Sequence, residues 1–127
     1  MARILLIDDE EGIRTLLKVM LEQDGHAVDV LEDGRRAVPM HQEHHYDLVI
    51  TDIFMPEEEG LETIRKLKKV SPDLKLIAMS GGGDIPYGGG LKVARLMGAD
   101  HVFFKPIPRK ELLEQVARLT TPEQPGE

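Results

Sequence analysis

The sequence predicts a single α/β domain built around a parallel β-sheet. Five short apolar runs alternate with segments in which apolar residues recur at helical spacing, the pattern of repeated βαβ units. Four of these runs end in an acidic, hydroxyl or lysine residue, and a parallel sheet places its functional groups at such ends. The length of 127 residues fits one domain with its own core.

The five apolar runs are the expected strands. The first stops at Asp8-Asp9-Glu10-Glu11, which indicates a buried strand that runs into an acidic loop. The expected strands cover residues 4–7, 27–30, 48–50, 74–79 and 102–104.

The clearest helix follows this acidic loop, because apolar residues recur on one helical face and Asp24-Gly25 then supplies a stop. Further helices are expected at residues 61–70, 91–97 and 111–119. The apolar face of the first helix comprises Ile13, Leu16, Leu17, Met20 and Leu21.

The second helix, at about residues 34–44, has the weakest pattern. Pro39 stands where an interior amide would donate its hydrogen bond, so we expect this helix to start late or to bend. His41, His44 and His45 include an i, i+4 pair that could hold a metal, but Glu43 is the only obvious third ligand nearby. We therefore expect a solvated face there.

Composition excludes several classes of function. The net charge of −7 argues against direct binding of nucleic acid, and the lack of cysteine excludes disulfides, thiolate metal sites and cysteine nucleophiles. The apolar run at the N-terminus is too short for a signal peptide or a membrane span, so we expect a cytoplasmic protein without a membrane partner. Residues 1–120 are expected to form the domain, and residues 121–127 a disordered tail.

Five polar residues should meet at the carboxyl edge of the predicted sheet. Asp8 and Asp9 follow the first strand, and Asp52, Ser80 and Lys105 follow the third, fourth and fifth. Ligands bind outside this edge in open parallel sheets. Each residue alone could be a helix cap, a turn, a loop or a connector, but their shared position favours a common site.

The chemistry of this residue set points to phosphoryl transfer. Three carboxylates close together repel one another unless a cation neutralises them, and Mg²⁺ prefers such oxygen ligands and often works with phosphate. A lysine supplies a movable positive charge, and a serine hydroxyl can donate to a phosphoryl oxygen. Positioning and charge neutralisation are what phosphoryl transfer needs.

Over residues 3 to about 119 the sequence resembles a known family, the receiver domains of two-component response regulators. The resemblance implies a flavodoxin-like (βα)5 doubly wound sheet with strand order 2-1-3-4-5. The motifs that carry it are LLIDDE at 5–10, DLVITDIFMP at 47–56 with Gly60, AMS at 78–80, GAD at 98–100 and FKP at 104–106.

The resemblance also implies residue roles. Asp52 would accept a phosphoryl group from a phosphohistidine on a sensor histidine kinase or a histidine phosphotransfer protein. Asp9 would bind Mg²⁺ directly and Asp8 often through water, with Asp52 and the backbone carbonyl of Phe54 as further ligands. Mn²⁺ is expected to substitute for Mg²⁺.

In the same family the counterparts of Ser80 and Lys105 hold the phosphoryl oxygens, and the Lys105-Pro106 peptide is usually cis. Such a protein is not an enzyme in the usual sense, beyond its own phosphorylation and slow dephosphorylation. With no output domain expected after Leu119, it would signal by docking onto an unidentified downstream protein.

Two departures from the family pattern bear on that output. The loop after Ser80 is about three residues longer than the family spacing and is rich in glycine over residues 81–90. Val102 stands where the family usually carries an aromatic that moves on phosphorylation. We therefore hypothesise that ordering of residues 81–90, including Tyr87, transmits the signal.

Three alternative functions share part of this pattern. A haloacid-dehalogenase-type phosphatase needs an acid two residues after its nucleophile, where this chain has Phe54. A flavin-binding protein needs a phosphate-cradling loop where this chain has Asp8-Asp9. A receiver-like docking module that is never phosphorylated is the third, and the full set of chemical residues disfavours it.

Overall fold

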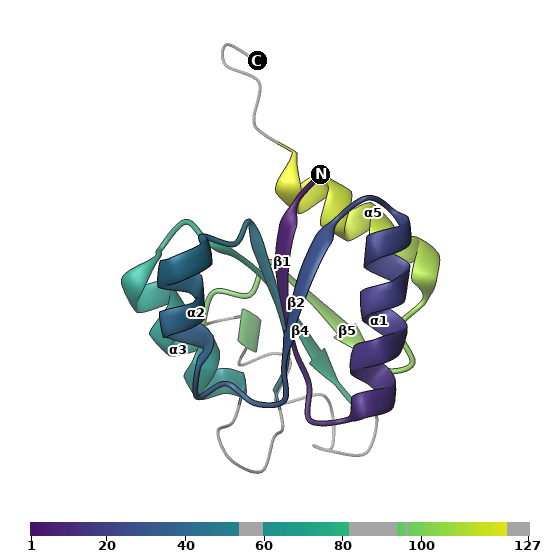
Figure 1. Ribbon diagram of the computed structural model, residues 1–127. Helices are drawn as coiled ribbons and strands as arrows, with labels where there is room; N and C mark the ends of the chain where they lie inside the picture. The colour runs from purple at the N-terminus through teal and green to yellow at the C-terminus, as the bar shows by residue number, and fades with distance from the viewer. Residues whose placement is uncertain (54–59, 82–93, 96, 122–127) are drawn as a thin grey trace.

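The computed structural model describes residues 1–53, 60–81, 94–95 and 97–121, and its centre is a five-stranded parallel sheet (Figure 1). The strand order β2-β1-β3-β4-β5 confirms the order that the family resemblance implies. All five expected strands are present, shifted by at most two residues at either end. They are β1 (Arg3–Ile7), β2 (Ala27–Leu31), β3 (Leu48–Asp52), β4 (Lys75–Ser80) and β5 (His101–Phe104).

Helices cover both faces of the sheet. Figure 1 shows α1 and α5 on one side and α2 and α3 on the other. The expected helix at 91–97 falls largely outside the described residues, as do the glycine-rich stretch and the C-terminal tail after residue 121. The helices whose two ends both lie within the described residues are α1 (Glu11–Gln23), α2 (Ala37–His44), α3 (Gly60–Val70) and α5 (Arg109–Thr120).

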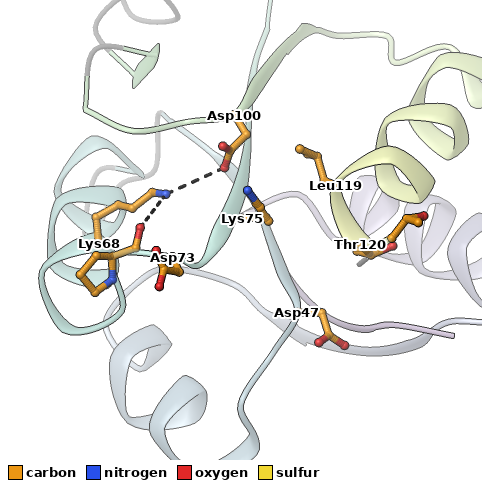
Figure 2. A pocket seen from close by; sticks show the side chains of 9 residues that line it. Asp47, Lys68, Asp73, Lys75, Asp100, Leu119 and Thr120 are labelled. Atoms are coloured by element: carbon orange, nitrogen blue, oxygen red, sulfur yellow. Dashed lines mark hydrogen bonds and ion pairs between the residues drawn. The ribbon is translucent and has the colours of Figure 1, made fainter. Parts of the chain in front are cut away.

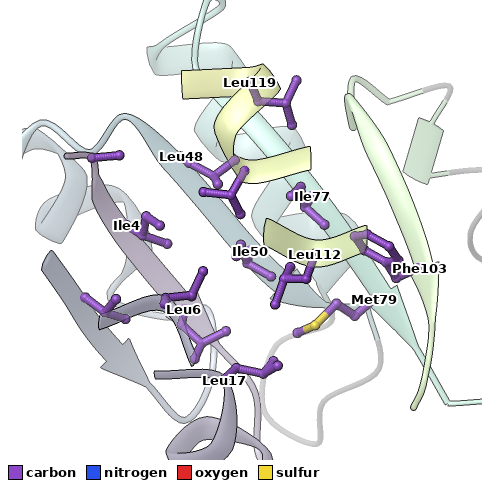
Figure 3. Packing of buried hydrophobic residues seen from close by; sticks show 14 residues of the cluster. Ile4, Leu6, Leu17, Leu48, Ile50, Ile77, Met79, Phe103, Leu112 and Leu119 are labelled. Carbon is purple, nitrogen blue, oxygen red and sulfur yellow. The ribbon is translucent and has the colours of Figure 1, made fainter. Parts of the chain in front are cut away.

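Two apolar clusters, one on each face, hold these layers together. Successive side chains of a strand point to opposite faces, so Leu5 and Ile7 pack toward α2 and α3 while Ile4 and Leu6 pack toward α1 and α5. Figure 3 shows the second cluster, in which Leu112 of α5 lies over the sheet. Burial on both faces explains why these strands read as continuous apolar runs.

The predicted apolar face of α1 was too wide. Leu17 and Leu21 are buried, and Ile13 and Met20 are packed against the same cluster, but Leu16 is 51% exposed. A residue one step before Leu17 is turned about 100° around the helix, so it lies at the margin of a stripe centred on the other four.

The late start of α2 is confirmed. The helix begins at Ala37, which puts Pro39 in the first turn, where backbone N–H groups have no partner within the helix. The interior position that would have been costly for proline is thereby avoided.

His41 corrects the expectation of a solvated histidine face. It is buried, and its Nδ1 accepts a hydrogen bond of 3.1 Å from the backbone N–H of Tyr46. His45 ends the helix with φ of 53°, a left-handed conformation that turns the chain back toward His41. Burial, and secondarily the proximity of His45, lowers the pKa of His41, so this residue serves the core as a neutral acceptor.

Gly60 provides a sharp test of how α3 sits against the sheet. A Cβ atom at this position would lie 2.0 Å from the backbone oxygen of Asp52, and backbone cannot move aside as a side-chain tip can. We expect Gly60→Ala to lower the free energy of unfolding in urea by about 2–3 kcal/mol. In Gly12→Ala the new methyl group would meet no described atom within 4 Å, so this control should be neutral or stabilising. Equal effects of the two substitutions would contradict the close approach.

Candidate functional site

The carboxyl edge of the sheet gathers the predicted polar residues. Asp52 is the last residue of β3 and Ser80 the last of β4, while Asp8 and Lys105 directly follow β1 and β5. Because β1 pairs with β3, Asp8 and Asp52 leave neighbouring strands. Both carboxylates are buried, with exposed fractions of 0% for Asp8 and 4% for Asp52.

The side chain of Lys105 joins the two carboxylates. Its Nζ lies 2.7 Å from Asp8 Oδ2 and 3.1 Å from Asp52 Oδ2, with Glu10 Oε1 at 3.7 Å. Asp52 accepts a hydrogen bond from this ammonium group, and the shorter contact to Asp8 is a close ion pair. The lysine therefore compensates two buried negative charges at once.

Electrostatics keep Lys105 charged. Burial alone would lower the pKa of its ammonium group, but the contacts with Asp8 and Asp52 outweigh burial, and the pKa is raised. A permanently cationic side chain at this edge can attract and hold an anionic group.

Asp8 also anchors the local backbone. Its Oδ1 accepts a hydrogen bond of 2.9 Å from the N–H of Glu10, and its backbone oxygen accepts one of 2.7 Å from Arg14 Nη1. The buried Asp8 Oδ2 instead pairs with the ammonium group of Lys105 at 2.7 Å. One Asp8 oxygen thus holds the backbone and the other holds the lysine.

Three adjacent acids form the arrangement best suited to a metal ion among the described residues. One carboxylate oxygen from each of Asp8, Asp9 and Glu10 lies within 4.8 Å of the others, and Asp9 and Glu10 are exposed. This all-oxygen donor set fits Mg²⁺ or Mn²⁺. Glu10 was not among the candidates from sequence, although it continues the acidic run. Phe54, whose carbonyl was also expected here, lies outside the described residues.

Ser80 lies at the base of the same edge. It is buried, and its hydroxyl donates a hydrogen bond of 3.1 Å to the backbone oxygen of Gly81. The backbone N–H of Lys105 donates a hydrogen bond of 2.8 Å to the backbone oxygen of Ser80, so the ends of β4 and β5 are tied together. The Lys105-Pro106 peptide bond is cis, as the family resemblance implies.

The amino edge of the sheet carries a polar hollow of about 500 Å³ (Figure 2). Lys68 Nζ donates to the backbone oxygen of Leu74 at 2.7 Å and lies 3.9 Å from Asp100 Oδ2. Asp100 Oδ2 in turn accepts from the N–H of Leu76 at 2.9 Å. These contacts tie α3 to β4 and to the entry of β5, and we assign them a structural role.

Comparison with known proteins is consistent across sequence and structure. Residues 4–117 match the response regulator receiver domain family. The response regulator MprA of Mycolicibacterium vanbaalenii is 33% identical over 125 residues, which cover 95% of this chain and 52% of MprA. The chemotaxis protein CheY of Halobacterium salinarum is 31% identical over 119 residues, covering 94% of this chain and 97% of CheY.

Solved structures give the same result. A response regulator receiver domain protein from Clostridium thermocellum superposes with a TM-score of 0.84 at 30% identity, covering 94% of both chains. CheY4 from Vibrio cholerae has a TM-score of 0.82 at 26% identity, covering 94% of this chain and 98% of CheY4. The chain spans about half the length of MprA and similar relatives. Within the described residues, no helix is long and apolar enough to cross a membrane.

The bridge made by Lys105 can be tested by removing it. In metal-free buffer at pH 7, Lys105→Met leaves two buried carboxylates without their cation and should lower the free energy of unfolding by about 3 kcal/mol. Asp52→Asn in the Lys105→Met background should recover part of this loss, because one of the two like charges is gone. Urea unfolding of the four combinations measures the coupling, and strictly additive effects would contradict the bridge.

The difference in free energy of unfolding between the wild type and Lys105→Met should depend on pH with a defined sign. A raised pKa means that Lys105 contributes its full stability below about pH 10.4, the value of an unperturbed lysine, and loses it as pH rises through the folded-state pKa. The wild type should therefore keep its advantage over Lys105→Met across the neutral range.

Proposed function

Because the chain belongs to the response regulator receiver domain family of two-component signalling, we propose that Asp52 accepts a phosphoryl group from a phosphohistidine. The donor would be a sensor histidine kinase or a histidine phosphotransfer protein. The observation that carries this proposal is the position of Lys105 Nζ between the buried carboxylates of Asp8 and Asp52.

The proposed transfer starts from the ionised carboxylate of Asp52. An Asp52 oxygen attacks the phosphorus atom, the bond between phosphorus and the donor imidazole nitrogen breaks, and its electron pair stays on the imidazole. The ammonium group of Lys105 is close enough to Asp52 to pair with a phosphoryl oxygen attached there. The product is an aspartyl phosphate.

Ser80 would supply a hydroxyl donor to the same phosphoryl group. Its present acceptor is the oxygen of Gly81, so contact with phosphate requires rotation of the hydroxyl about the Cα–Cβ bond. Such a change of partner links the state of Asp52 to the backbone that follows β4.

The transfer is proposed to need Mg²⁺, or Mn²⁺ in its place. Asp8, Asp9 and Glu10 present oxygen atoms close together on the loop after β1, and Asp52 and the Phe54 carbonyl are proposed as further ligands. When bound, the ion neutralises negative charge on the phosphoryl oxygens. Asp8 keeps the ammonium group of Lys105 in place beside Asp52.

The output is proposed to be docking onto a downstream protein, in the cytoplasm, without direct binding of nucleic acid. Receiver domains are signalling modules rather than classical enzymes. We propose that the chemistry of this chain is limited to its own phosphorylation and slow dephosphorylation. A docking module that never takes phosphate is not favoured, because Asp8, Asp52 and Lys105 are assembled.

The phospho-acceptor can be identified directly. A kinase with a labelled phosphohistidine, chosen from a panel of purified candidates, should label the wild type with a hydroxylamine-sensitive bond. Asp52→Asn should abolish this label, because an amide oxygen is a poor nucleophile. Asp73→Asn is the matched control, because Asp73 is an exposed acid at the opposite edge of the sheet. The Asp73→Asn variant should be labelled to the same extent as the wild type. Full labelling of Asp52→Asn would sink the assignment.

The metal requirement gives a second test. Chelation should stop the transfer, and Mg²⁺ binding measured by calorimetry should weaken more in Asp9→Ala than in Asp8→Ala. Asp8 already has one oxygen on the Glu10 N–H and the other beside Lys105, whereas the family role of Asp9 is direct metal contact. For Asp9→Ala we expect a loss of affinity of about tenfold or more. The reverse order of the two variants would contradict the proposed ligand roles.

A further inference from the structure

Phe104 is a large apolar side chain in an unusual position. It ends the edge strand β5, directly before Lys105, and it is 57% exposed. Packing among the described residues does not explain an aromatic residue there, because Phe104 lies outside both core clusters that they form. Its neighbour Phe103 is buried and packs against Met79 (Figure 3).

Alternation along β5 fixes the face on which Phe104 lies. Phe103 packs in the cluster that faces α1 and α5, together with Ile77 and Met79 of β4. Val102 packs instead with the cluster on the other face, which contains Ala78. Since the side-chain period of a strand is two residues, Phe104 shares the face of Val102.

Ser80 lies on that same face, beside Phe104. It is two residues beyond Ala78 on β4, and the register of the parallel pair sets Ser80 opposite Phe104. Neighbouring strands are about 4.8 Å apart, so side chains that are paired on one face are in contact range. The hydrogen bond from the Lys105 N–H to the Ser80 oxygen, at 2.8 Å, fixes this register at the strand end.

We propose that Phe104 is a positioning residue that covers the Ser80 side of the phosphoryl group on Asp52 and slows its hydrolysis. This inference rests on the proposed function. The ring carries no proton donor or acceptor, so it cannot activate water. Its bulk excludes water from one flank of the site and restricts the rotation of the Ser80 hydroxyl, which keeps that hydroxyl on the phosphoryl oxygens.

The step that the ring would slow is the attack of water on the aspartyl phosphate. The water oxygen forms a bond to phosphorus, the bond from phosphorus to the Asp52 oxygen breaks, and Asp52 leaves as a carboxylate. Both hydrogens of the water depart with the phosphate as dihydrogen phosphate, which then equilibrates with solvent. No other reactant is needed.

The lifetime of the aspartyl phosphate tests this role. The wild type, Phe104→Ala, Phe104→Leu and Val30→Ala are phosphorylated with a small-molecule donor and Mg²⁺, the donor is removed, and loss of phosphate is followed. We expect Phe104→Ala to lose phosphate about fivefold faster than the wild type, a modest change in barrier height, and Phe104→Leu to fall between the two. Val30→Ala removes an exposed apolar side chain from the other edge strand and should match the wild type.

Further measurements separate this role from a structural one. The urea midpoint and the metal affinity of Phe104→Ala should stay close to those of the wild type, since the ring lies largely in solvent. In unfolding concentrations of urea, the aspartyl phosphates of the wild type and of Phe104→Ala should decay at the same rate, because the ring acts only in the folded site.

The outcomes distinguish the two proposals. A wild type that takes phosphate neither from the small-molecule donor nor from any phosphorylated kinase of the panel would refute the proposed function itself. Equal lifetimes in labelled wild type and Phe104→Ala, or a Phe104→Leu lifetime no longer than that of Phe104→Ala, would overturn the inference about Phe104 and leave the proposed function standing.

Discussion

Repulsion between two buried carboxylates is the constraint on which the site depends. The pairing of β1 with β3 brings Asp8 and Asp52 to neighbouring strand ends, away from the water that would otherwise screen their charges. Lys105 compensates both from the end of β5, a strand that pairs with neither β1 nor β3. A long aliphatic stem ending in a compact charge can reach across that gap and still follow a shift of charge, which a planar guanidinium would do less readily.

The rest of the fold keeps these charges in register. Gly60 lets α3 begin directly against the Asp52 carbonyl, and the Ser80 oxygen holds the Lys105 amide at the neighbouring strand end. At the amino edge the ammonium group of Lys68 ties the end of α3 to Leu74, and Gly98, with φ of 118°, leaves room for the Lys68 stem. At the amino edge the charged groups of Lys68 and Asp100 are used in internal contacts, while the carboxyl edge concentrates charge that a ligand can use.

Much of this could be predicted from the sequence because the controlling patterns are local. Apolar runs predict every strand, and the rule that strand ends share one edge predicts that Asp8, Asp52 and Lys105 lie close together. The misses arose where the answer depends on distant or marginal geometry. The burial of His41 follows from the left-handed turn at His45. Leu16 lies at the border of the apolar stripe of α1, where helical periodicity alone does not tell whether a side chain is buried.

The all-parallel sheet has a consequence for how the chain folds. Each parallel pair needs a crossover, so β1 cannot meet β3 through a tight turn. The hydrogen bond from the Arg3 N–H to Asp47 Oδ2 accordingly joins residues that are 44 positions apart in the chain. Asp52 and Lys105 are separated by a further 53 residues. Topologies dominated by such non-local contacts fold slowly, because loop closure must precede the contacts that stabilise it. A nascent chain that has formed β1 and β3 but not β5 would hold its two acids without their lysine, so the charge-balanced site cannot form before β5 is in place.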